Sequence, residues 1–224
     1  DSAKSQSSNL SGFTQNLQQL TNQAGTFATA IAGAGLALTA FSVGYANSVK
    51  EMVNLARLAD SNTTEFQRMA VAASSYGVTQ EQLADQIKDF NEKLGEFILT
   101  GKGEGVDAFE TLNKHAKMTT AEISKFALEM QKASGPQALL MYVEKLEEAG
   151  VSQEQMSFLV ENMGNDLTKL LPILRNGGEE LNRLANEAQR LGVILDEEAI
   201  EQALELEKQI KLMKMQAQGA TNQF

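Results

Sequence analysis

Histidine is the side chain best suited to acid–base or metal chemistry near neutral pH, and the chain has a single copy, His115. A Ser-His-Asp arrangement would have to use it, yet no Gly-x-Ser-x-Gly segment is present to supply a nucleophile. A zinc site needs several His or Cys ligands, and His115 is the one such residue in the chain. We therefore expect His115 to be a surface residue, and we expect no catalytic residue and no metal site.

Two further patterns could contact a ligand, and neither fits the chemistry. The glycine-rich segment 101–105 (GKGEG) lacks the GK[ST] or GxGxxG arrangement of a phosphate loop, which also needs a preceding strand. The adjacent carboxylates Glu147/Glu148 and Glu179/Glu180 point about 100° apart on a helix, so they do not converge on a substrate. We expect the chain not to be an enzyme and to use no cofactor.

Composition favours helices over strands. The 224 residues include only two prolines, and Ala, Leu, Gln, Glu, Met and Lys are abundant, so we predict an all-α fold. There is no cysteine, which excludes disulfides and thiolate metal sites. The formal net charge of −10 repels a phosphate backbone, so we expect no stable nucleic-acid binding.

The N-terminal quarter of the chain is unusual because no formal charge occurs from Ser5 to Val49. Residues 1–25 are predicted to form a polar N-terminal arm, and residues 26–60 a long apolar helix rich in Ala and Gly. The arm carries a thin apolar stripe at three- and four-residue steps, which consists of Leu10, Phe13, Leu17, Leu20 and Ala24. The order of these segments predicts that the apolar helix precedes the rest of the fold.

Residues 24–46 (AGTFATAIAGAGLALTAFSVGYA) form a run long enough to cross a bilayer as a helix. Small residues at four-residue steps within it would also let another helix approach closely. We predict that this helix associates with its own copies, with membrane insertion as a conditional second state. A buried central helix of an ordinary helical domain is the alternative. The predicted self-association or membrane-facing residues are Phe27, Ile31, Gly33, Leu36, Ala37, Phe41 and Gly44.

Residues 61–178 are predicted to form a multi-helix domain of short capped helices. Four N-cap pairs mark helix starts: Asn62 with Glu65, Thr79 with Gln82, Thr119 with Glu122, and Ser152 with Gln155. Asp166 is expected to cap a helix over 167–171, and the segment Asn176-Gly177-Gly178 is expected to form a turn. Glycine or a turn closes each helix.

Residues 179–224 are predicted to form a charged helical region that is interrupted at Gly192 and restarted by Asp196 as N-cap. Its last part repeats apolar residues at steps of three and four, which predicts a coiled-coil-like seam through Ala203, Leu206, Ile210 and Met213. Acids dominate the start of this helix and lysines its end, as the helix dipole prefers.

An ordered series of landmarks resembles the amino-terminal part of the tail-length tape measure proteins of long-tailed bacteriophages and prophages. After the Ala/Gly-rich helix come residues 55–67 (LARLADSNTTEFQ), 72–79 (AASSYGVT) and 90–97 (FNEKLGEF). The most specific landmark is 163–174 (MGNDLTKLLPIL), and the series closes with 191–196 (LGVILD). The similarity extends over about residues 24–215.

The resemblance implies a structural virion protein that is mostly helical. Members of that family lie in the lumen of the tail tube, help set tail length and leave during DNA ejection. The implied partners are the tail tube protein, tail chaperones, tail tip proteins and further copies of the chain, with the host membrane reached on ejection. The implied location is the virion tail, after assembly in the host cytoplasm.

A second interpretation comes from another class of protein. The amphipathic and apolar helices are also typical of a membrane-interacting helical bacterial protein, such as a segment of a pore-forming toxin. That interpretation does not account for the ordered landmarks that continue to Pro172.

Overall fold

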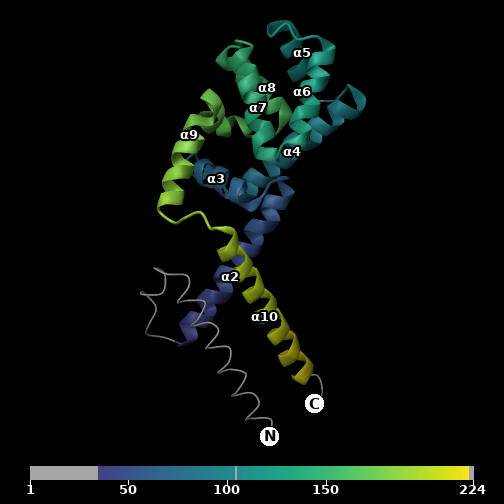
Figure 1. Cartoon of the computed structure of the whole chain (residues 1–224). Coiled ribbons are helices and arrows are strands. Elements are labelled where there is room, and N and C mark those ends of the chain that lie inside the picture. The colour runs from purple at the N-terminus through teal and green to yellow at the C-terminus, as the bar shows by residue number, and fades with distance from the viewer. Residues whose placement is uncertain (1–34, 104, 222–224) are drawn as a thin grey trace. The chain divides into compact units, whose positions relative to one another are not determined.

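The structure is a computed structural model that describes residues 35–103 and 105–221, with side chains described for 44–103 and 105–215 (Figure 1). The helices are α2 (Gly35–Leu58), α3 (Thr63–Ser74), α4 (Gln80–Thr100), α5 (Val106–His115), α6 (Thr120–Lys132), α7 (Gly135–Glu148), α8 (Gln153–Met163), the 3-10 helix η2 (Leu167–Leu170), α9 (Leu171–Arg190) and α10 (Glu197–Thr221). Among the described residues there is no strand, which confirms the predicted all-α class.

The chain divides into two compact units. We call Glu51–Leu195 the helical domain, and we call the described residues 35–50 and 196–221 the helix pair. Helix α2 contributes its first part to the helix pair and its last part to the helical domain. Within the predicted apolar helix 26–60, residues 26–34 lie outside the described part of the chain. In the part that is described, none of the helices combines the length and hydropathy needed to cross a membrane.

Local capping places most helix starts in the helical domain. The Asn62 side chain accepts a hydrogen bond from the Glu65 backbone N–H, and Thr79, Thr119 and Ser152 each close a full capping box. The predicted pairs are therefore confirmed, because each needs only a hydroxyl or amide and a Glu or Gln three residues later. Asp196 also caps α10, since its Oδ1 accepts from the Ala199 N–H at 2.8 Å.

One predicted cap is wrong. Asp166 has φ 60 and ψ 9, which is left-handed rather than the extended conformation of an N-cap, and its carboxylate binds Lys169 Nζ at 2.8 Å. The backbone N–H of Asp166 donates instead to the Glu161 carboxylate at 3.0 Å. The segment that follows is a short 3-10 helix.

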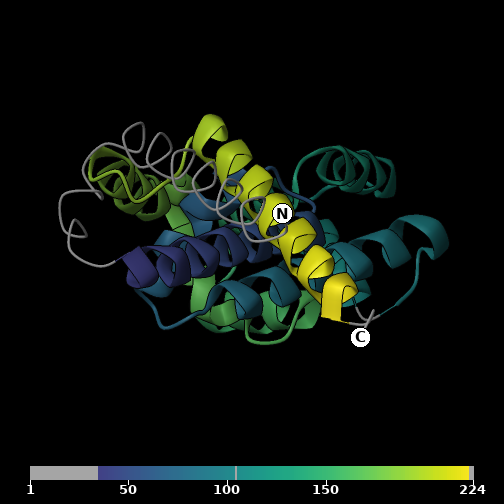
Figure 2. The same cartoon turned by 90° about the horizontal axis from the view of Figure 1, so that it is seen from below.

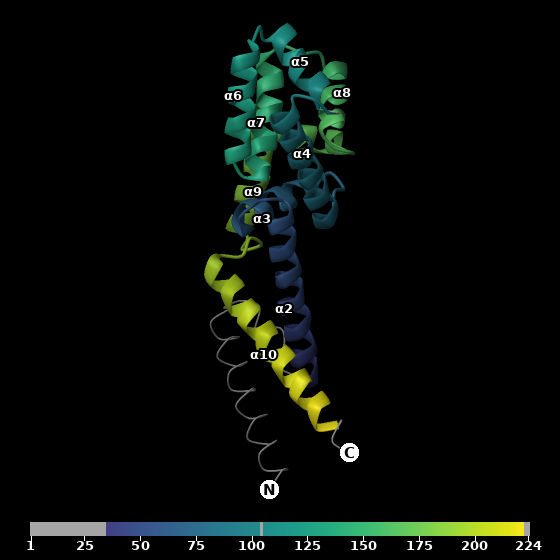
Figure 3. The same cartoon turned by 90° about the vertical axis from the view of Figure 1, so that its right-hand side faces the viewer.

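The core of the helical domain is built around stacked and tilted rings. Tyr142 is completely buried, with its ring 5.6 Å from Phe90 and 6.4 Å from Phe109, and Phe97 stacks on Phe109 at 3.9 Å. Figure 3 shows α6 and α7 side by side with α4 next to them, and these three helices contact one another pairwise. The Tyr142 hydroxyl donates to the Leu159 carbonyl oxygen at 3.0 Å, which ties α7 to α8.

The predicted turn at 176–178 interrupts α9. Asn176, Gly177 and Gly178 have φ values of 54, 64 and 73, so three consecutive residues are left-handed. Gly177 and Gly178 adopt left-handed φ values at little steric cost because they carry no Cβ. The turn is confirmed.

Candidate functional site

The helix pair holds most of the residues that the sequence marked for association. In Figures 1 and 2, α10 crosses α2 at an angle, and the two helices diverge beyond the crossing. Ala46 of α2 forms a buried cluster with Leu206 and Ile210 of α10. Beside that cluster, Lys50 Nζ and Glu207 Oε1 form an ion pair at 2.7 Å. The crossing is therefore a small apolar contact closed by one charge pair.

The predicted coiled-coil-like seam is divided by this crossing. Ala203, Leu206 and Ile210 are 3%, 7% and 9% exposed, whereas Met213 is 40% exposed. Since the helices diverge beyond the crossing, the seam buries its first three residues and leaves its fourth accessible.

The predicted self-association residues fall in three groups. Phe27, Ile31 and Gly33 lie outside the described residues, and Leu36, Ala37 and Phe41 lie in α2 where side chains are not described. Gly44 is exposed, and a Cβ built on it would meet nothing within 4 Å. The space beside Gly44 is therefore open within the described part of this chain.

Next to Gly44, the phenol of Tyr45 is 38% exposed. Burial raises the pKa of Tyr45, and the negative charge of Asp196 raises it further. Tyr45 therefore stays neutral at physiological pH and presents an uncharged surface on α2.

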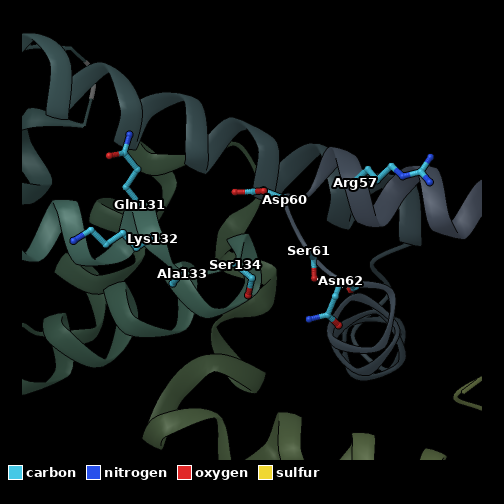
Figure 4. Close-up of a pocket in the computed structure, with 8 residues that line it drawn as sticks. All are labelled: Arg57, Asp60, Ser61, Asn62, Gln131, Lys132, Ala133 and Ser134. Carbon is cyan, nitrogen blue, oxygen red and sulfur yellow. Dashed lines mark hydrogen bonds between the residues drawn. The ribbon is translucent and has the colours of Figure 1, made fainter. Parts of the chain in front are cut away.

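A shallow polar pocket of about 430 Å³ lies in the helical domain, between the turn after α2 and the turn before α7. Its lining residues are Arg57, Asp60, Ser61, Asn62, Gln131, Lys132, Ala133 and Ser134. Figure 4 shows the two cationic side chains, Arg57 and Lys132, at opposite ends of the pocket and pointing away from each other. The pocket therefore has no focused positive charge.

The polar groups inside this pocket are mostly used by the fold. Arg57 Nη1 contacts Asn54 Oδ1 at 3.4 Å, and the carbonyl oxygen of Asp60 accepts from the Gly135 N–H at 2.9 Å. The Ser134 hydroxyl is buried and has no hydrogen-bond partner among the described residues. One free hydroxyl with diverging cations is too little to orient a ligand.

The landmark 163–174 is used for packing and for one tight turn. Helix α4 holds this turn at two points, since Gln86 Nε2 donates to the Asp166 carbonyl oxygen at 3.3 Å and Lys93 Nζ donates to the Asn162 carbonyl oxygen at 3.0 Å. Six apolar side chains of the landmark are buried, namely Met163, Leu167, Leu170, Leu171, Ile173 and Leu174.

Two polar contacts were missed by the sequence analysis. Gln67, 8% exposed, accepts from the Leu195 N–H at 2.8 Å and donates to the Leu195 carbonyl oxygen at 3.1 Å. Its neighbour Arg68 reaches three amide oxygens of α9, those of Asn182, Asn186 and Gln189. The only signal in the sequence was that polar residues occur within an otherwise buried helix. That signal does not identify the residues that Gln67 and Arg68 contact.

The side chains whose types could support catalysis or metal binding do not lie together in the structure. His115 is exposed at the end of α5, and Glu147 and Glu148 bind different partners, Arg175 and Lys145. Among the described residues no three His, Asp or Glu side chains are grouped to hold a metal ion.

Comparison of the chain with protein-family models, with curated proteins and with solved structures finds no match.

Proposed function

We propose that this chain is a structural segment of a tail tape measure protein from a long-tailed bacteriophage or prophage. In this role it lies in the lumen of the tail tube, contributes to tail length and leaves during DNA ejection. Its partners are other copies of the chain, the tail tube protein, tail chaperones and tail tip proteins. The negative net charge fits passage ahead of DNA without stable binding to it.

The observation that carries the proposal is the use of the landmark 163–174. Its apolar residues are buried and its turn is anchored to α4 by Gln86 and Lys93. A catalytic signature would present polar groups to a cavity, whereas this one stabilises a helical scaffold. The most distinctive segment of the chain thus contributes buried core residues, as expected of a structural protein.

The role in assembly is supported by the uncharged run that leads into α2. No formal charge occurs from Ser5 to Val49, and a Cβ built on Gly44 would meet nothing within 4 Å in the described part of the chain. A helix with a small exposed residue can accept the backbone of another helix at close range. We place self-association of the chain on this run.

Substitution at Gly44 tests the assembly role without disturbing the fold. Because no described residue lies within 4 Å of a Cβ at this position, we expect Gly44→Leu to leave the described fold intact. Self-association, measured by sedimentation and light scattering, is expected to weaken at least tenfold. Gly95→Leu is the matched control, since Gly95 is also a helix glycine with open space and lies in the helical domain. A wild-type chain that is monomeric without detergent overturns the assembly role.

Tail length is tested in the parent gene. If the segment acts as a helical ruler, each deleted residue removes about 1.5 Å, so an in-frame deletion of 20 residues shortens tails by roughly 30 Å. Electron micrographs of purified tails give the length, and a duplication of the same residues should lengthen them. Complete tails of unchanged length in both variants contradict the length role.

The membrane-interacting alternative has a separate measurement. It is favoured by the same uncharged run, and it requires that the purified chain releases dye from liposomes. No release at high protein concentration removes it, whereas release by the wild-type chain and not by Gly44→Leu would favour it over the tail role.

A further inference from the structure

The left-handed turn of α9 contains Asn176-Gly177, which is the one Asn-Gly pair in the chain. Both residues are exposed. An asparagine side chain can react with the backbone nitrogen of the next residue, and glycine obstructs that nitrogen least because it has no Cβ. This pair is therefore the place where the chain is chemically most prone to deamidate, a covalent change that consumes only water.

Deamidation at this pair proceeds through a succinimide ring. The backbone nitrogen of Gly177 loses its proton and attacks Cγ of Asn176, so that a C–N bond forms. The bond from Cγ to the side-chain nitrogen breaks, and that nitrogen takes up a proton and leaves as ammonia. Water then opens the ring at Cγ, which gives aspartate, or at the backbone carbonyl carbon, which gives isoaspartate. Either product carries one more negative charge than asparagine.

The closed turn keeps the two reacting atoms apart. Asn176 has φ 54 and ψ 44, which is the left-handed conformation. In that conformation Cβ lies close to the carbonyl oxygen of its own residue. The Gly177 nitrogen is on the other side of the carbonyl carbon, so it points away from the Asn176 side chain. The ring cannot close until ψ of Asn176 rotates, which requires the turn to open.

Helix α7 holds the turn closed from both sides of this bond. Glu147 Oε2 accepts from the Asn176 N–H at 2.9 Å, and Glu147 Oε1 accepts from Arg175 Nε at 3.1 Å. Hydrogen bonds to a carboxylate are stronger than those between neutral groups. On the other side Gly178 is buried, and a Cβ built on it would lie 3.0 Å from Leu140 Cδ1. Rotation of ψ at Asn176 must therefore disturb contacts with α7.

We propose that Asn176 is a deamidation site whose reaction is gated by Glu147. The closed turn blocks the reaction, and local opening of the turn permits it. Isoaspartate adds one carbon atom to the backbone between residues 176 and 177, so the modified turn no longer fits against α7 as before. Because α9 packs on both α3 and α7, the reaction is a one-way loosening of α9. The inference does not depend on the proposed viral role.

The site is tested by incubation of the full chain in mildly alkaline buffer, with and without urea. Peptide mapping follows each asparagine over time, with fragment ions that separate Asn176 from Asn182. In urea we expect Asn176 to deamidate faster than any other asparagine, and in the folded chain roughly tenfold or more slowly than in urea. Equal rates at Asn176 with and without urea overturn the proposal, as does another asparagine that reacts first in urea.

The gate is tested by substitution of Glu147 in the folded chain. Glu147→Ala is expected to raise the deamidation rate at Asn176 roughly fivefold or more. Glu147→Gln keeps an acceptor for the Asn176 N–H and should give a smaller increase, which also serves if Glu147→Ala does not fold. Glu148→Ala, on the same helix, should leave the rate unchanged. A rate at Asn176 that neither Glu147 variant raises overturns the gate.

A variant that weakens the domain elsewhere separates local opening from global unfolding. Gln67→Ala removes the contact with Leu195 and leaves the turn of α9 intact, so the deamidation rate at Asn176 should stay near that of the wild type. If Gln67→Ala speeds the reaction as much as Glu147→Ala does, the whole domain must unfold first, and the gate is overturned.

The loosening is tested on the modified chain itself. The added negative charge lets anion exchange separate the deamidated chain from the unmodified one, and peptide mapping identifies the isoaspartate form. Hydrogen exchange in residues 171–178 of that form is expected to be roughly tenfold or more faster than in the unmodified chain. Unchanged exchange in this segment overturns the one-way loosening.

Discussion

The side chain of Gln67 in α3 forms two hydrogen bonds with the backbone of Leu195, 128 residues later. Its Oε1 accepts from the Leu195 N–H at 2.8 Å and its Nε2 donates to the Leu195 carbonyl oxygen at 3.1 Å. Leu195 is the last residue of the helical domain, directly before the Asp196 cap of α10. One buried amide thus fixes where the chain leaves this domain.

Removal of this amide should loosen the segment that precedes α10. Gln67→Ala leaves both backbone groups of Leu195 without their side-chain partner, so the free energy of unfolding should fall by about 2 kcal/mol. Hydrogen exchange at the Leu195 amide should also become faster. Gln80→Ala changes an exposed glutamine and should stay within about 0.5 kcal/mol. Unchanged exchange at Leu195 in Gln67→Ala would contradict this role.

Contacts between near neighbours in the sequence were predictable, and distant ones were not. The capping boxes at Thr79, Thr119 and Ser152 were predicted because both partners lie within three residues. The partner of Gln67 lies 128 residues away, so no local pattern could name it. The Asp166 cap was predicted from residue type alone, and it failed because the backbone there is left-handed.

The candidate site was predictable in part for the same reason. The three- and four-residue spacing located Ala203, Leu206 and Ile210 on one face, and all three are buried. The same spacing placed Met213 on this face and predicted that it would be buried, but Met213 is 40% exposed. Its exposure depends on the angle at which α10 crosses α2. Crossing angles are set by side-chain packing between helices, which periodicity within one helix does not contain.

A second prediction concerns the close approach of α7 to the end of α2. A Cβ built on Gly135 would lie 2.1 Å from the Ala59 carbonyl oxygen and 2.4 Å from Ile87 Cγ2. Because the first of these atoms is backbone, Gly135→Ala must displace α7, and we expect a loss of about 3 kcal/mol in unfolding free energy. Gly95→Ala is the matched change in open helix surface and should gain up to about 1 kcal/mol. Equal effects of the two substitutions in urea denaturation would refute this explanation.

A third prediction concerns the left-handed turn in α9. Glu147 Oε1 accepts from Arg175 Nε at 3.1 Å, and its Oε2 accepts from the Asn176 N–H at 2.9 Å. Glu147→Ala removes both acceptors, so we expect a loss of about 1.5 kcal/mol in unfolding free energy. Glu147→Gln should lose less, since an amide oxygen can still accept from the Asn176 N–H.

The neighbouring glutamate supplies the control for this turn. Glu148 is 58% exposed and pairs with Lys145 on the same helix, so Glu148→Ala should cost less than about 0.5 kcal/mol. Added salt should narrow the difference between wild type and Glu147→Gln, because it screens the pair with Arg175. Identical stabilities of Glu147→Ala and Glu148→Ala would show that the turn does not need its acceptor.

The last prediction is a pH dependence that comes from Tyr142. Burial raises the pKa of Tyr142 far above the value of about 10 that the phenol has in an unfolded chain. Below pH 10 the phenol is protonated in both states, so its contribution is constant; above pH 10 only the unfolded chain loses the proton. The free energy of unfolding should then fall by up to about 1.4 kcal/mol per pH unit.

The variant Tyr142→Phe lacks this contribution, so its free energy of unfolding should decline less steeply between pH 10 and pH 11. At pH 7 the same variant loses the hydrogen bond to Leu159, which is worth about 1 kcal/mol. Parallel profiles for wild type and Tyr142→Phe would contradict the assignment.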